Sequence, residues 1–278
     1  MSAFINPFSD FGFKKIFGEE ASKPVLIDFL NALLPLESHI SDLTFKNSEQ
    51  LSESAESRKV VFDIYCENEK GEKFIVELQK ARQNFFKERT IYYSTFPIRE
   101  QVERNDYKYN LKAIYCIGIL DFAFKDYGDD EDKKRVVHEI KLKNQNGKVF
   151  YDKLTYIYLE MPNFLKKENE LATHLDKWLY FIKNLNNLND IPLIFTKDVV
   201  FMEAFNKAKL SGLSQDEYAS YINSIKGYND WMSVMDTKLE EAELRIKRDL
   251  AKSLKSNGVA LEIIQKTTRL SIDEIQDL

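Results

Sequence analysis

Two short apolar runs separated by a polar turn form the clearest strand pattern in the chain. Residues 60–66 (VVFDIYC) and 74–79 (FIVELQ) are rich in β-branched and aromatic residues, which favour strands, and the segment 68–71 (NEKG) between them is typical of a turn. Each run nevertheless contains an acid, Asp63 in the first and Glu77 in the second. Acids are depleted from strands and are costly to bury without a partner, so this pair indicates a functional site.

The hydrophobic pattern around these runs predicts a mixed α/β domain. Apolar residues recur at helical spacing on both sides of the pair, and a nearly continuous apolar run of strand length follows, which is typical of a strand covered on both faces. We expect, in chain order, a helical turn at 10–17, a helix at 24–34, a strand at 40–45, a loop at 47–57, the two strands, a long helix at 84–105 and a strand at 111–121. This order predicts a mixed sheet with a helix packed on each side.

The second half of the chain changes from strands to helices. Ser271 and Glu274 have capping-box spacing at the start of the last helical segment. We expect strands at 136–143, 149–151 and 154–159, helices at 170–185 and 199–209, a charged helix at 230–256 ending at Asn257-Gly258, and two short helices at 260–266 and 272–278. The chain is therefore expected to form an α/β domain at 1–228 and an all-helical C-terminal module at 229–278.

Composition and charge narrow the class of protein. The 278-residue chain is 44% hydrophobic and 31% charged, which is a globular balance, and its net charge of −5 excludes a generally basic nucleic-acid coat but allows a local basic face. The pattern of a signal peptide and a stretch of membrane-spanning length are both missing, so we expect a soluble, cytoplasmic protein with no membrane partner. Cys66 and Cys116 lie in apolar runs and are expected to be buried thiols.

The turn between the two strands decides whether Asp63 and Glu77 can meet. A two-residue loop would send the acids to opposite faces of the sheet, whereas a three-residue loop ending at Gly71 places Asp63 directly across from Glu77. The longer loop needs a left-handed third residue, a conformation that glycine adopts readily. Gly71 therefore favours the second register, in which Gln79 shares the face of the acids and Val61 continues that face into the core.

Asp63 and Glu77 would then lie about 5 Å apart between their Cβ atoms, and two carboxylates this close repel each other when they are removed from water. A divalent cation resolves the repulsion, and Mg²⁺ takes oxygen ligands at about 2.1 Å. The acids could instead form a solvated pair at the edge of the sheet, or be neutralised by Lys59 or Lys80. We expect the metal site.

Several segments of the chain together resemble one protein family. Asp63, the hairpin and Glu77-Leu78-Gln79 resemble the PD-(D/E)XK nuclease signature. The segments similar to motifs of the recombination-promoting nuclease (putative transposase) family are 10–18 (DFGFKKIFG), 89–93 (RTIYY), Tyr109, 118–122 (GILDF), 258–264 (GVALEII) and 268–271 (TRLS). The resemblance extends over nearly the whole chain and implies a restriction-endonuclease-like fold, a mixed sheet flanked by helices.

The resemblance also implies a metal-dependent DNA endonuclease of mobile-element character. Asp63, Glu77 and the Leu78 backbone carbonyl would hold Mg²⁺, or Mn²⁺ or Ca²⁺ in its place, and the metal would polarise the scissile phosphate and lower the pKa of a bound water. Two positions depart from the signature, since Phe62 stands where proline is usual and Gln79 stands where lysine is usual. Gln79 cannot carry positive charge or act as a base, but it could orient the water through hydrogen bonds.

Three further residues are candidate accessory groups at this site. Asp10 could contact the metal through water from the start of the first helix, or it could be the N-cap of that helix. Tyr93 and Gln101 lie on the long helix expected to face the site. One of the adjacent rings of Tyr92 and Tyr93 could instead lie in the core with the other at the surface, and Gln101 could be an ordinary surface residue.

A cluster of cations marks the charged C-terminal helix. Between residues 245 and 255 there are five cations and one acid, a local charge of 5 − 1 = +4, and these cations are Arg245, Lys247, Arg248, Lys252 and Lys255. DNA phosphates could bind this face, although a solvated helix beside acidic neighbours has the same pattern. The terminal helix pair is similar to a small helix-turn-helix, and such pairs serve dimerisation as readily as base recognition. We expect DNA as the partner and homo-oligomerisation through the C-terminal helices.

Two other functions fit the same residues. A catalytically weak DNA-binding or self-association protein could keep the nuclease fold, and a toxin-like defence nuclease could be controlled by its own C-terminal module. Plasmid nicking that depends on magnesium and on both Asp63 and Glu77 would separate the endonuclease from the first alternative.

Overall fold

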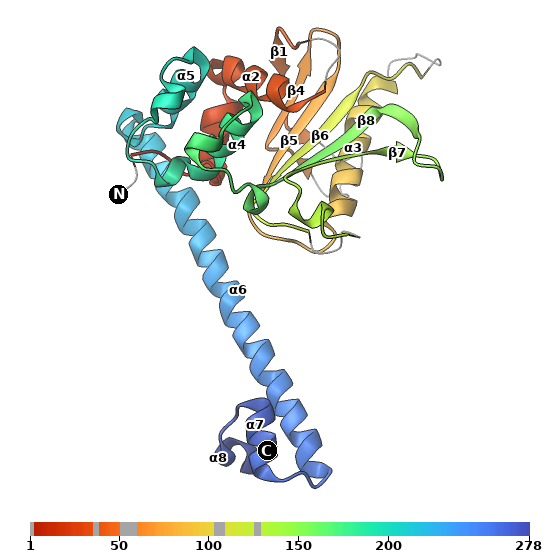
Figure 1. Ribbon diagram of the computed structural model, residues 1–278, viewed down its shortest axis with the longest axis vertical. Helices are drawn as coiled ribbons and strands as arrows, with labels where there is room; N and C mark the ends of the chain where they lie inside the picture. Colours follow the sequence, from red (N-terminus) through yellow and green to blue (C-terminus); the bar gives the residue numbers. More distant parts are fainter. Residues whose placement is uncertain (1–2, 36–38, 51–59, 103–108, 125–128) are drawn as a thin grey trace. The chain divides into compact units, whose positions relative to one another are not determined.

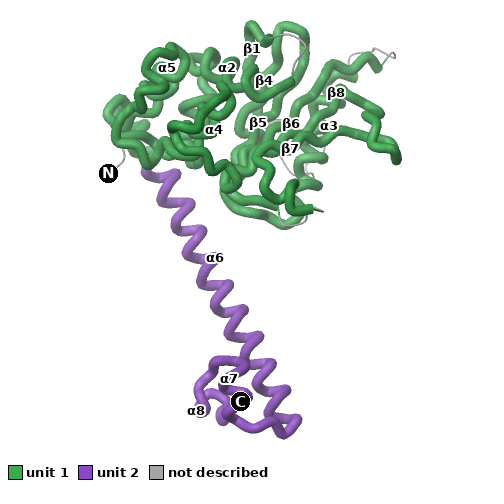
Figure 2. The backbone as a smooth tube through the Cα atoms, viewed as in Figure 1, with its two compact units in different colours: residues 1–221 green, residues 222–278 purple. Residues whose placement is uncertain are grey.

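The computed structural model of the chain describes residues 3–35, 39–50, 60–102, 109–124 and 129–278. The chain divides into two compact units, residues 1–221 and residues 222–278 (Figure 2). The first unit contains the sheet and the helices that cover it. The second contains most of the long helix α6 (Gln215–Ser256) and two short helices.

A six-stranded mixed sheet forms the centre of the first unit, with the strand order β1-β4-β5-β6-β8-β7 (Figure 1). β5 is parallel to β6, and β6 is parallel to β8, while the other neighbours are antiparallel. The strands are β1 (Leu43–Phe45), β4 (Ile64–Asn68), β5 (Lys73–Gln79), β6 (Ile114–Leu120), β7 (Val137–Lys143) and β8 (Val149–Glu160). This arrangement confirms the mixed sheet predicted from the sequence.

Helices flank the sheet on both faces, as predicted (Figure 1). The α-helices of the first unit are α1 (Asp10–Phe13), α2 (Lys23–Leu33), α3 (Phe86–Val102), α4 (His174–Asn184) and α5 (Val199–Ala208), and the second unit adds α7 (Leu261–Thr268) and α8 (Ile272–Gln276) to the end of α6. Short helical turns are η1 (Lys14–Gly18, π-type) and the 3₁₀ turns η2 (Glu20–Ser22), η3 (Asp132–Lys134), η4 (Met161–Asn163), η5 (Glu168–Glu170), η6 (Leu185–Asn187), η7 (Leu193–Phe195) and η8 (Leu210–Gly212). None of the described helices combines the length and the apolar character needed to cross a membrane.

Alternation along β4 and β5 sends their side chains to two different cores. The even-numbered apolar residues of both strands pack with α2, α4 and α5, whereas the odd-numbered Tyr65 and Ile75 pack on the opposite face with Phe86 of α3. Asp63 and Glu77 are odd-numbered as well. The acids therefore belong to the face that α3 covers.

The predicted strand at 60–66 is divided in the structure, and that prediction was wrong. Residues 60–61 form β3, which pairs with β2 (Glu49–Gln50) in a separate ladder, and Phe62 and Asp63 separate β3 from β4. Because β3 follows β2 rather than the main sheet, Val61 is 47% exposed and does not continue the acid face into the core. β2 also lies within the predicted loop at 47–57, of which residues 51–57 are outside the described residues.

Two other element boundaries differ from the prediction. The strands expected at 149–151 and 154–159 are one strand, β8, whose pairing with β7 shifts between Lys141 and Lys143. The charged helix begins at Gln215 rather than at 230, because Ser214 and Glu217 form a capping box: the Glu217 N–H donates to Ser214 Oγ (3.2 Å), and the Ser214 N–H donates to Glu217 Oε2 (2.8 Å).

Several local expectations are confirmed. Cys66 and Cys116 are buried free thiols, and burial raises the pKa of Cys66 to about 12. Gly258 ends α6 with φ +75°, and Ser271 and Glu274 form the predicted capping box at the start of α8.

Candidate metal centre

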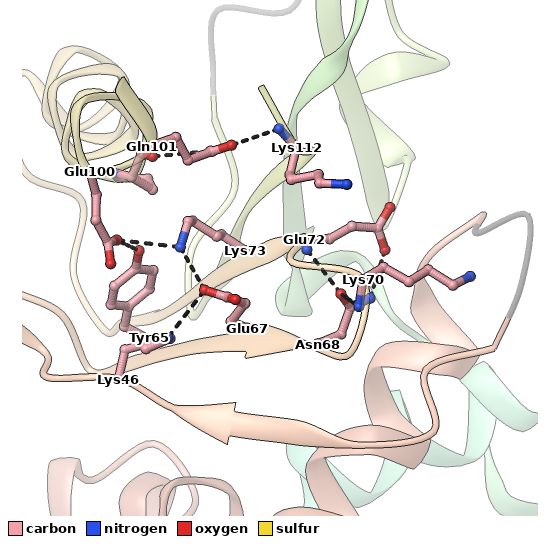
Figure 3. Close-up of polar contacts among 11 residues, drawn as sticks. Lys46, Tyr65, Glu67, Asn68, Lys70, Glu72, Lys73, Glu100, Gln101 and Lys112 are labelled. Carbon is pink, nitrogen blue, oxygen red and sulfur yellow. Dashed lines mark hydrogen bonds and ion pairs between the residues drawn. The ribbon is translucent and has the colours of Figure 1, made fainter. Parts of the chain in front are cut away.

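The turn between β4 and β5 sets the register of the acid pair. Gly71 adopts φ +80°, and its N–H donates to the Asn68 carbonyl (3.0 Å). The Asn68 Oδ1 accepts hydrogen bonds from the N–H groups of Lys70 (3.0 Å) and Glu72 (2.9 Å), which closes the turn (Figure 3). This is the three-residue loop predicted from Gly71, and the side chain of Asn68 reinforces it.

Asp63 and Glu77 lie across from each other where the hairpin ladder ends. The observed pairing of Ile64 with Val76 places these two acids at the next step. The Asp63 N–H donates to Glu77 Oε1 (3.1 Å), and the Leu78 N–H donates to Asp63 Oδ2 (2.8 Å). Each carboxylate thus accepts a hydrogen bond from the backbone of the opposite strand, and the predicted register is confirmed.

Burial raises the pKa of both acids. For Glu77 the neighbouring charge of Asp63 adds to the effect of burial and raises the pKa to about 8. For Asp63 the upward shift persists although the Leu78 hydrogen bond and the charges of Lys14 and Arg89 oppose it. Without a cation between them, the two carboxyl groups therefore retain a proton near neutral pH.

Lys14 brings positive charge to the acids from the N-terminal helical turn. Its Nζ lies 2.8 Å from Asp10 Oδ1, one helical turn earlier. Burial lowers the pKa of Lys14, but the hydrogen bond to Asp10 and the charges of Asp10, Asp63 and Glu77 outweigh burial and raise it overall. Lys14 therefore responds to the field of the acid pair as well as to its own ion-pair partner.

Arg89 brings a second cation to the site from α3. Its Nη2 donates to Gln79 Oε1, its Nη1 donates to Gln83 Oε1, and its guanidinium lies over the rings of Phe86 (5.3 Å to the centroid) and Tyr93 (5.8 Å). The buried Nε of Arg89 has no hydrogen-bond partner among the described residues. This arrangement fixes the guanidinium beside the position where the nuclease signature usually has lysine.

Gln79 is held at both ends of its amide. Its Oε1 accepts from Arg89, and its Nε2 donates to the Ala81 carbonyl (3.0 Å). It is buried at the end of β5, on the same face as Glu77, as predicted. The amide retains one further lone pair and one further N–H for a water molecule.

The three candidate accessory residues differ in how they lie relative to the acid pair. Tyr93 is half-buried and packs from α3 against the apolar cluster on this face of the sheet, whereas the adjacent Tyr92 is exposed. Burial raises the pKa of Tyr93, and the charge of Glu77 adds to the shift. Asp10 lies near Asp63, but it is not the N-cap of α1, because Ser9 accepts the capping hydrogen bond from the Gly12 N–H. The N-cap interpretation of Asp10 was therefore wrong.

Gln101 is not brought to the acids. Its Oε1 accepts from the Lys112 N–H (2.6 Å), just before the start of β6 (Figure 3). Glu77 pairs with Gly118, near the opposite end of β6. Gln101 therefore connects α3 to the segment that leads into β6 instead.

The five cations of the C-terminal helix lie in the other unit, 222–278, and Asp63 and Glu77 lie in the first. Lys247 pairs with Glu243 (2.7 Å), and the Lys255 Nζ donates to the Gln276 carbonyl (2.7 Å). Arg245, Arg248 and Lys252 are exposed. DNA binding by this cluster remains a prediction.

Sequence analysis missed Lys14 and Arg89 as members of the site. Both lie in segments that carried the family resemblance, DFGFKKIFG and RTIYY, but nothing in their spacing relates them to the strand acids. A signal did exist, since Lys14 follows Asp10 by four residues and Arg89 precedes Tyr93 by four, which places each pair on one side of a helical turn. Only the folded chain brings both pairs to the acids.

The donor set suits a hard divalent cation. Two facing carboxylates with raised pKa values form an oxygen site that a divalent ion would neutralise. Among the described residues no three His, Cys, Asp or Glu side chains gather at one point, so the site offers two carboxylates and backbone oxygen. Mg²⁺ typically binds proteins through one or two carboxylates and keeps several waters.

Comparison with known proteins identifies the family. A family model described as PD-(D/E)XK nuclease family transposase matches residues 7–238, a span that includes both acids, Gln79, Lys14 and Arg89. Searches among curated proteins and among solved structures gave no match. PD-(D/E)XK nucleases generally use divalent metals. Because the model matches most of the chain, and the mixed sheet with its flanking helices agrees with this fold, the chain belongs to the PD-(D/E)XK nuclease family transposases.

Proposed function

We propose that this chain is a divalent-metal-dependent endonuclease that hydrolyses phosphodiester bonds of DNA at the Asp63–Glu77 pair. The observation that carries the proposal is the facing of these two acids in one hairpin, with a raised pKa for each. Among the residues that the structure describes, neither acid has an ion-pair partner within 4.0 Å. Two facing acids with raised pKa values are typical of a functional site, where a bound cation would take the place of the proton that they otherwise retain.

Asp63, Glu77 and the Leu78 carbonyl would hold the metal. The Leu78 N–H points to Asp63, and the carbonyl of a strand residue faces the same edge as its N–H, so this oxygen lies on the side of the acids. A bound divalent ion supplies a Lewis acid for the phosphate and lowers the pKa of its water. Glu77 would give up its proton when it becomes a ligand.

The neighbouring side chains would act on the substrate. Gln79, fixed by Arg89 and the Ala81 carbonyl, would orient the attacking water with its remaining hydrogen-bonding capacity. Lys14 and Arg89 would stabilise the negative charge that grows on the phosphate oxygens. These two cations would replace the charge that lysine usually provides at the position of Gln79.

Supercoiled plasmid provides the direct test. Purified protein with Mg²⁺ should convert it to nicked and linear forms, and EDTA, Asp63→Asn and Glu77→Gln should each reduce the rate by about 10²–10³-fold. Glu67→Gln is the matched control, because Glu67 lies on the same face of the hairpin as Asp63, four residues along the chain. Nicking that survives either active-site variant would contradict the proposal.

The main alternative, a catalytically weak DNA-binding protein, is favoured by one residue, Gln79 in place of lysine. A gel-shift titration with the same DNA separates the two functions. Metal-dependent binding without cleavage under any divalent ion would support the alternative, and cleavage that is lost in Asp63→Asn while binding is kept would support the endonuclease.

A further inference from the structure

The long helix α6 carries a continuous heptad pattern in its central part. From Ile225 to Ile246 the residues at alternating spacings of three and four are all apolar. In the usual heptad letters, the a positions are Ile225, Met232, Leu239 and Ile246, and the d positions are Tyr228, Met235 and Ala242. Three unbroken heptads are the pattern of a two-stranded coiled coil.

No residue of this stripe is buried in the single chain. Leu239 is 69% exposed and Ile246 is 65% exposed, and among the 42 residues of α6, all of which are described, only Ala251 is buried. Helices derive most of their stability in proteins from packing of an apolar face. A helix with this much accessible apolar surface along one face therefore gains stability from a partner there.

The short helices of the same unit cover a different side of α6. Ala251 and Leu254 pack with Ile264, Leu270 and Ile275 of the terminal segment. In the same heptad letters Ala251 is an f position and Leu254 is a b position, opposite the a and d stripe. The apolar stripe ends at Asp249, a d position, where the packing against α7 and α8 takes over.

We propose that residues 225–246 form a parallel two-stranded coiled coil with a second copy of this chain. In a parallel pair each g position meets the e position five residues later on the partner helix. Lys238 is at g and Glu243 is at e, so the two helices would gain two Lys238–Glu243 ion pairs by symmetry. The apolar stripe and the charges beside it are therefore complementary to the same surface on a second copy of the helix.

The antiparallel arrangement is disfavoured by the same residues. If the a and d residues are kept in contact about the centre of the stripe, with Met235 facing the partner's Leu239, Asp236 lies beside the partner's Asp236, and Lys238 lies beside the partner's Lys238. Both of these flanking contacts join like charges, which opposes this orientation. The charges therefore select the parallel pair and a second copy as the occupant.

Sedimentation or light scattering of the full chain tests the assembly. The wild-type chain should be a dimer at micromolar concentration, and Leu239→Asp at an a position should weaken the dimer at least tenfold. The matched control is Leu244→Asp, an exposed leucine at an f position of the same helix, which should leave the dimer intact. Circular dichroism of both variants separates a loss of assembly from a loss of helix.

A cysteine placed on the seam tests the orientation. Ile246→Cys should form a disulfide-linked dimer under mild oxidation, because parallel pairing brings the two a positions together. In the antiparallel arrangement the same residues lie about 27 Å apart along the axis, eighteen residues at 1.5 Å each. The wild-type chain is the background control, since Cys66 and Cys116 are buried.

Three outcomes would overturn the proposal: a monomeric wild-type chain, equal sensitivity of the dimer to Leu239→Asp and Leu244→Asp, or no cross-link in Ile246→Cys. If the wild-type chain is a monomer, the apolar stripe binds a different protein and not a second copy of this chain. None of these results bears on plasmid nicking by the acid pair, so the proposed endonuclease stands or falls separately.

Discussion

Two cross-strand pairs on one face of the β4–β5 hairpin have opposite electrostatic character. At one end Asp63 faces Glu77, two like charges, and four residues along Glu67 faces Lys73, two opposite charges. The Lys73 Nζ lies 2.7 Å from Glu67 Oε2 and 3.4 Å from a carboxylate oxygen of Glu100 on α3 (Figure 3). The two pairs lie on the same face of one hairpin and under the same helix, so they differ mainly in the side chains that each pair brings together.

The pKa shifts follow this difference. Burial would raise the pKa of Glu67, but its hydrogen bonds and ion pairs with Lys73 and Lys46 outweigh burial and lower it. At the other pair burial and like charge raise the pKa of Glu77. Lys73 and Lys46 neutralise Glu67, which stabilises the folded hairpin. Asp63 and Glu77, where we expect a ligand to bind, have no such ion pair among the described residues.

Removal of the buried cation should give the largest effect. Lys73→Met leaves Glu67 and Glu100 without their shared partner, and because the Lys73 side chain is only 6% exposed we expect a loss of about 3 kcal/mol in the free energy of unfolding. Urea denaturation measures this. Lys46→Met is the control, since Lys46 pairs with the same Glu67 from a more exposed position and should cost less than about 1 kcal/mol. Equal losses would contradict the role assigned to burial.

Removal of the guanidinium at the acid end should reduce activity more than stability. Arg89→Ala is expected to lower the rate of plasmid nicking about 10- to 100-fold, because Gln79 loses its anchor and the site loses a cation. Arg89→Lys should recover part of the rate, which a purely structural role would not predict. Arg135→Ala, at a surface arginine paired with Asp132, is the control and should nick at the wild-type rate.

The stability of the metal-free protein should fall as pH rises from about 5 to 8. Over this range folded Glu77 retains a proton that the unfolded chain has released, because its pKa is raised from 4.5 to about 8. Each pH unit then lowers the free energy of unfolding by at most about 1.4 kcal/mol. Denaturation in EDTA at several pH values measures the slope, and Glu77→Gln should flatten it. Glu67 contributes with the opposite sign, since its lowered pKa stabilises the fold above about pH 4.5 and this contribution is lost on acidification. If the pH dependence of the free energy of unfolding persists in Glu77→Gln, another titratable group causes it.

Strain at the turn should give the smallest effect. Gly71→Ala is expected to cost about 1 kcal/mol, because φ is +80° and an added Cβ would make only an ordinary contact, 3.4 Å from the Lys112 side chain. Gly147→Ala, at φ +76° with no atom within 4 Å of the added Cβ, is a matched control for backbone strain alone. Thermal unfolding compares the stability of the two variants. A much larger loss of stability in Gly71→Ala than in Gly147→Ala would indicate that Gly71 does more than supply a left-handed residue.

The sequence predicted the fold and the acid pair where the signal is local. Gly71 indicated the loop length, and the loop length indicated the face shared by Asp63, Glu77 and Gln79. The division of strand 60–66 was missed because it depends on pairing with β2, a partner that no local pattern in the run reveals. Lys14 and Arg89 were missed for the same reason, since they reach the acids only through tertiary packing.

Other features were present in the sequence but were outweighed by a stronger pattern. The predicted start of α6 is fifteen residues late, because the charged segment from residue 230 is a stronger helix pattern than the capping box at Ser214 and Glu217. The heptads of α6 are likewise a weaker pattern than the cluster of cations at 245–255.

The three-residue turn makes the length of this hairpin as important as its composition. Side chains alternate strictly along a strand, so a one-residue slip of β4 against β5 would turn Asp63 away from Glu77 and would also expose the apolar residues that both strands bury. An extra residue between Asn68 and Glu72 therefore has two possible outcomes, a longer loop that keeps the acids facing each other or a slip that separates them. The pairing of the acids is thus protected by the buried residues of the same two strands, although those residues contact neither the metal nor the substrate.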